Sequence, residues 1–94
     1  MSAQQPTVVY RVAPQRAAWR QAGEEVVVLD TRESVYFGLD PAGALLWRRL
    51  VDGATADELT EALVASAEVD RGRAADDVAR FLAELDGYGL VERA

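Results

Sequence analysis

The segment VYFGLDPAGALLW, residues 35–47, decides the fold because the chain changes there from strand chemistry to helix chemistry. Alternation along its first part places Val35, Phe37 and Leu39 on one face of a strand. The dipeptide Asp40-Pro41 then favours a helix start, because Asp is a good N-cap and Pro suits the first helical position. The segment therefore predicts a strand that leads directly into a helix.

Upstream of this segment the sequence predicts two further strands. Residues 25–30 (EVVVLD) are a run of β-formers, and residues 31–34 read as a turn, so 25–30 and 35–39 form a hairpin. Residues 8–12 are a shorter strand ending near Pro14. Residues 15–23 have no clean period and are interpreted as a loop or one helical turn.

Downstream the sequence predicts three helices. The first runs from Pro41 to about Val51, the second to about residue 67 behind a capping box at 55–58, and the third over about 70–88. Apolar residues of the third recur at helical spacing from Val78 to Leu85. The predicted fold class is α+β and winged-helix-like: a three-stranded antiparallel sheet followed by a three-helix bundle.

Composition limits the chemistry that the 94 residues can perform. The sequence has no His, no Cys and no Lys, and its ten basic residues are all Arg. These absences remove the usual general base at neutral pH, the thiol nucleophile, the Schiff-base amine and the main zinc ligands. We therefore expect no catalytic residues, no cofactor, no metal and no enzymatic activity.

The net charge of −6 is unevenly distributed. Residues 1–39 hold four acids and four Arg, whereas residues 40–94 hold twelve acids and six Arg. A helical half this acidic repels a phosphate backbone, which disfavours nucleic acid as the ligand.

The length of 94 residues suggests one small domain, over residues 8–91. The polar residues 1–7 are expected to be a flexible N-terminus. We find no apolar run of transmembrane length and no signal-peptide pattern, so we expect no membrane contact and a cytoplasmic protein.

Three residues need individual interpretation. Trp47 lies on an apolar helical face and is expected in the core, whereas Trp19 fits a core lid and an exposed contact equally well. Gly43 lies one turn into a helix, where Gly costs about 1 kcal/mol relative to Ala. A close packing contact against the sheet would explain a glycine at this position, so we expect one.

The strand at 35–39 also suggests a binding mode. If it forms a sheet edge, its backbone groups are open to an extended peptide, which would pair as an added strand. The alternative is that a bulge or the N-terminal segment covers this edge.

The ordered series of motifs resembles the PqqD-like family of precursor-peptide recognition elements, which serve ribosomally made, modified peptides. The resemblance covers about residues 25–91 and rests on these segments: Val28–Asp30, Tyr36–Trp47, Thr55–Leu59, Val69-Asp70, Asp77–Leu85 and Gly89–Val91.

This resemblance implies that a leader peptide is captured as an added strand between the third strand and the third helix. It implies that the peptide-binding residues are Ser34, Val35, Tyr36, Phe37, Gly38, Arg73, Asp76, Asp77, Arg80, Phe81 and Glu84.

The predicted function is that of a non-catalytic adaptor which presents a precursor to processing enzymes. The chain is similar to the free-standing recognition proteins of lasso-peptide biosynthesis, which implies a separate cysteine-protease leader peptidase and a cyclase as partners. A peptide chaperone of pyrroloquinoline quinone biosynthesis is the alternative within the family. A winged-helix DNA-binding regulator and a structural subunit of an enzyme complex are the alternatives from other classes.

Overall fold

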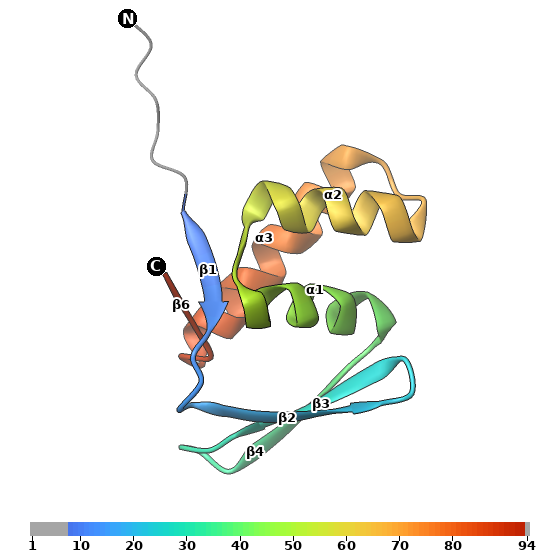
Figure 1. Cartoon of the computed structure of the whole chain (residues 1–94). Coiled ribbons are helices and arrows are strands. Elements are labelled where there is room, and N and C mark those ends of the chain that lie inside the picture. The colour runs from blue at the N-terminus through green and yellow to red at the C-terminus, as the bar shows by residue number, and fades with distance from the viewer. Residues whose placement is uncertain (1–7, 94) are drawn as a thin grey trace, which may run out of the picture.

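The computed structural model describes residues 8–93, so the predicted flexible segment at 1–7 lies outside the described residues. The described chain has the predicted α+β class, with strands in two antiparallel sheets and three helices (Figure 1). The elements, in chain order, are β1 (Val9–Val12), β2 (Ala17–Ala22), β3 (Glu25–Asp30), β4 (Val35–Leu39), α1 (Pro41–Asp52), β5 (Ala54–Thr55), α2 (Ala56–Ala67), α3 (Arg71–Gly87) and β6 (Val91–Arg93).

The larger sheet has the order β2-β3-β4 and contains the predicted hairpin with its predicted bounds. The prediction of a loop or helical turn over residues 15–23 was wrong, because most of that segment is strand β2. Gly23, with φ +65°, begins the two-residue connection between the paired residues Ala22 and Glu25. The aliphatic β3 supplies the pairing partner, and this non-local pairing overrides the weak β-propensity of the AAWRQA segment.

The predicted strand at 8–12 forms as β1, but its expected place in the hairpin sheet was wrong. β2 already pairs with β3, and β1 instead lies between β5 and β6 in a second sheet. Val12 lies opposite Val91, and both side chains are buried. The second sheet therefore joins the first strand of the chain to the last.

The three helices begin and end at the predicted signals. The Asp40 carboxylate accepts a hydrogen bond from the Gly43 N–H at 2.8 Å, and Asp70 accepts one from the Arg73 N–H at 2.9 Å. The Thr55–Glu58 capping box is complete in both directions. After α1 the chain turns at Gly53, with φ +98°, a conformation that favours glycine.

The core lies between the β2-β3-β4 sheet and the helices, with α1 lying over one face of that sheet (Figure 1). Trp47 is fully buried, as predicted, against the inward face that includes Val26 and Val28. Trp19 packs edge-on to Trp47 with ring centroids 6.5 Å apart, yet 39% of its surface stays exposed, so it is a partial lid over the core. Within residues 8–93, none of the helices has the length and apolar character needed to cross a membrane.

Candidate functional site

Strand β4 is a free edge of the larger sheet, because within residues 8–93 it pairs only with β3. The Thr31 N–H donates to the Arg16 carbonyl at 3.0 Å, so the backbone groups of Thr31 point toward β2. Because backbone groups of successive residues point to opposite sides of a strand, those of Asp30 point toward β4. Val35 lies opposite Asp30 and therefore bonds back to β3. The backbone N–H and C=O groups of Tyr36 and Gly38, the alternate residues, point outward from the sheet edge. A second chain can pair with them.

An apolar pocket of about 160 Å³ lies beside this edge, between β4 and α3. A cavity of about 150 Å³ accommodates a benzene-sized group, so the pocket has room for one apolar side chain. Tyr88 forms its rim through an edge-on contact with Phe37, with ring centroids 4.6 Å apart. The lining residues are Val28, Phe37, Leu39, Phe81, Glu84, Leu85, Tyr88 and Leu90.

A second hollow, of about 340 Å³, continues along β4 toward the start of α1 and shares Leu39, Phe81 and Glu84 with the apolar pocket. Its other lining residues are Gly38, Asp40, Ala42, Gly43, Leu46, Leu63 and Asp77. We call the two hollows together the β4–α3 groove. Its floor is apolar, and the rim of the second hollow is acidic.

Gly43 lies in the groove where α1, β4 and α3 converge. A Cβ there would lie 3.5 Å from the Leu39 Cβ and 3.6 Å from the Phe81 Cε1, which are ordinary van der Waals distances. Its one tight contact, at 3.3 Å, would be with the Asp40 Oδ1 that caps α1, so the expectation that close packing against the sheet accounts for this glycine was wrong.

The charged residues of α3 pair with one another along the groove. Asp77 lies 3.9 Å from Arg73 and 3.4 Å from Arg80, so two exposed guanidinium groups balance its carboxylate. Glu84 forms no ion pair with any residue of 8–93 and lines both parts of the groove.

The residues that the resemblance implied fall into three positions. Phe37, Gly38, Asp77, Phe81 and Glu84 line the groove; Ser34, Val35 and Tyr36 lie on the turn and edge of the hairpin; and Arg73 and Arg80 flank the groove through Asp77. Asp76 is exposed and lines neither hollow. The binding role of all eleven residues stays a prediction.

We did not predict Leu39, Asp40, Leu85, Tyr88 and Leu90 as site residues. Tyr88 could have been found, because it continues the helical spacing that joins Asp77, Phe81 and Glu84 on one face of α3.

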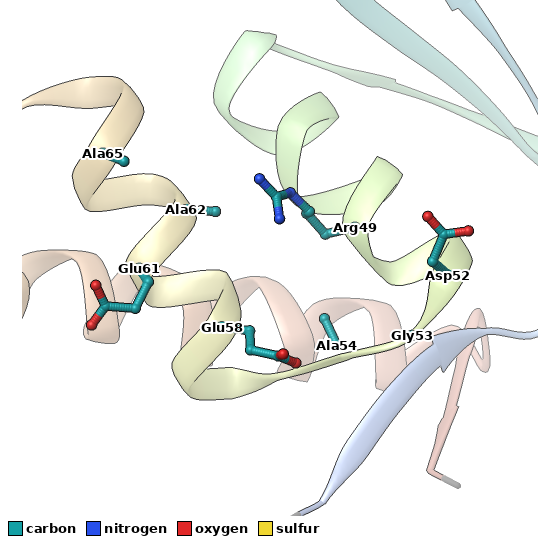
Figure 2. Close-up of a pocket in the computed structure, with 8 residues that line it drawn as sticks. All are labelled: Arg49, Asp52, Gly53, Ala54, Glu58, Glu61, Ala62 and Ala65. Carbon is teal, nitrogen blue, oxygen red and sulfur yellow. The ribbon is translucent and has the colours of Figure 1, made fainter.

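The larger hollow between α1 and α2, about 550 Å³, borders the edge strand β5 through Ala54, but the two residues of β5 offer an extended peptide far fewer backbone groups than the five residues of β4. Figure 2 shows Arg49 reaching from α1 toward α2 across it. Two of its three acidic side chains already have structural roles, because Glu58 completes the capping box and Glu61 pairs with Arg71, a contact that lowers the pKa of Glu61. We therefore place the site at the β4–α3 groove.

The outward face of the β2-β3-β4 sheet is a separate apolar surface. Ala18, Leu29 and Tyr36 lie across from one another on it, beside Val27, around a shallow hollow of about 240 Å³. Val27 and Leu29 are half-buried, and Tyr36 is 70% exposed.

Two solved structures resemble the chain over most of its length. A structure described as TbiB1 in complex with the TbiA(beta) leader peptide is 30% identical, covers 87% of this chain and 94% of its own, and has a TM-score of 0.80. A lasso peptide synthetase B1 complexed with the leader peptide is 29% identical, covers 88% and 96%, and has a TM-score of 0.76. No curated protein matches the sequence.

The model of the family described as coenzyme PQQ synthesis protein D (PqqD) matches residues 25–91, well over half of the chain. The matched region runs from the start of β3 to the start of β6, and so contains β4 and α3, the two elements that form the groove. The chain belongs to the PqqD family.

Proposed function

We propose that this protein is a non-catalytic adaptor that binds the leader segment of a ribosomally made precursor peptide as an added strand on β4. The observation that best supports this proposal is the free edge of β4, where the backbone groups of Tyr36 and Gly38 point outward beside an apolar groove. Backbone pairing would supply affinity, and the groove would select among peptides through their alternate side chains.

The two structural matches support a lasso-peptide leader as the ligand, because both are complexes with leader peptides. The family match keeps the peptide chaperone role of pyrroloquinoline quinone biosynthesis as the second candidate. Precursor genes beside the gene of this protein would distinguish the two pathways.

We further propose that the processing enzymes, a cysteine-protease leader peptidase and a cyclase, act as separate partners. A strand added at β4 would extend the outward face of the sheet, so alternate peptide side chains would appear beside Tyr36 and Leu29. The exposed apolar face therefore suits an enzyme that must contact the bound precursor. Holding the precursor there would raise its local concentration at the enzyme to about millimolar.

The binding proposal is tested by fluorescence anisotropy with a fluorescein-labelled leader peptide from the neighbouring precursor gene. We expect saturable binding at micromolar concentration or tighter, with no effect of added duplex DNA. A flat titration at 100 µM protein, roughly −5.5 kcal/mol of binding free energy, would refute the proposal. Salt-sensitive binding to promoter DNA in a gel shift would instead support the regulator alternative.

A further inference from the structure

Glu84 is an uncompensated carboxylate in an otherwise apolar part of the groove. The other residues around the 160 Å³ pocket are all aliphatic or aromatic. Glu84 is exposed and has no ion-pair partner within residues 8–93. Its charge is therefore available to a ligand lying in the groove.

The two neighbouring carboxylates differ from Glu84. Asp77 lies between two arginines, and Asp40, which caps α1 by accepting the Gly43 N–H, lines only the second hollow. Glu84 consequently supplies the unbalanced negative charge at the junction of the two hollows. An added strand that places a cation there gains an ion pair with Glu84.

The sheet geometry sets where that cation falls in the bound peptide. The pairs within this sheet are antiparallel, and antiparallel ladders are the slightly more stable kind. An antiparallel strand on β4 passes Leu39 and the acidic hollow first, and Phe37 and the apolar pocket afterwards. Since side chains alternate between faces, the two groove-facing positions are two residues apart.

We propose that the groove selects peptides with Arg or Lys two residues before the apolar side chain that fills the pocket, and that Glu84 is the residue that reads this cation. This inference rests on the proposed function and specifies the chemistry of its ligand. The recognised pattern is a basic residue, any residue and an apolar residue, in that order.

A peptide-display selection tests the pattern, with ten random residues as the probe and the full-length protein as the bait. We expect enriched peptides to carry Arg or Lys two residues before an apolar residue. Selection on Glu84→Arg should enrich Asp or Glu at that position, and Glu84→Gln should remove the charge preference. Asp52→Arg, which makes the same change in net charge at the end of α1 and outside the groove, should keep the basic preference.

Enriched peptides are then synthesised with Lys or Glu at the position two residues before the apolar residue. Replacing Lys by Glu should weaken binding to the natural protein about tenfold and strengthen binding to Glu84→Arg. Circular dichroism confirms that each variant is folded. Enrichment without a charge preference, or one that Glu84→Arg leaves unchanged, overturns this inference while the proposed function stands. Failure to enrich any peptide overturns the proposed function and the inference with it.

Discussion

Replacing Tyr36 by proline removes one outward-pointing backbone donor from the free edge of β4. Proline is tolerated at a strand edge whose N–H does not serve the ladder, so the domain should stay folded. The lost hydrogen bond is worth about 1 kcal/mol net, and the peptide carbonyl left without its donor costs about 1 kcal/mol more. The sum of about 2 kcal/mol predicts leader binding about 30-fold weaker.

Two matched variants isolate this effect in anisotropy titrations with the labelled leader. Tyr36→Ala removes the side chain but keeps the N–H, so any additional loss in Tyr36→Pro belongs to the backbone. Gln21→Pro makes the same change on β2, the opposite edge of the sheet, where alternation also turns the N–H outward. Equal affinities for Tyr36→Pro and Tyr36→Ala, or a larger loss in Gln21→Pro, would refute strand addition at β4.

Three further substitutions test the fold and the second surface. Thr55→Ala breaks the capping box and should lower the free energy of unfolding by about 1 kcal/mol in urea denaturation; an unchanged midpoint would contradict the importance of the cap. Gly89→Ala places a Cβ 2.8 Å from the Arg16 Nη1 at a φ of +72°, so it should lower the melting temperature and loosen Tyr88, whose carbonyl accepts from Arg16. If Gly89→Ala binds the leader normally at a temperature where it is fully folded, the contact between Arg16 and Tyr88 does not contribute to the groove. Leu29→Asp, on the outward sheet face, should leave leader affinity unchanged but slow precursor cleavage by the partner peptidase, and an unchanged cleavage rate would remove that face as the docking surface.

Local signals predicted much of this fold because they act over a few residues. Asp40, Asp70 and the capping box at Thr55 each satisfy backbone donors within their own helical turn, and all three were read correctly from sequence. The hairpin of β3 and β4 was equally local. On α3 the helical spacing placed Phe81 in the core stripe and Glu84 beside it, and only the family resemblance assigned both to the binding groove.

Long-range pairing was what the sequence did not reveal. Residues 17–22 have little strand propensity of their own and become β2 because β3 offers a partner. The three residues of β6 are too few to be recognised without β1 beside them. Helical spacing could have placed Tyr88 on the groove side of α3, but its contact with Phe37 joins two distant segments and has no local signal.

The pairing of β1 with β6 has a consequence for the motions of the groove. It joins residues about 80 positions apart, as in Tyr10 opposite Arg93, so closing it has a high entropic cost and it is expected to open before the local hairpin. Leu90, whose carbonyl accepts a hydrogen bond from the Ala13 N–H, also lines the apolar pocket. Opening of the small sheet would therefore loosen the pocket wall, and a bound leader should slow hydrogen exchange at Ala13 although it never touches β1.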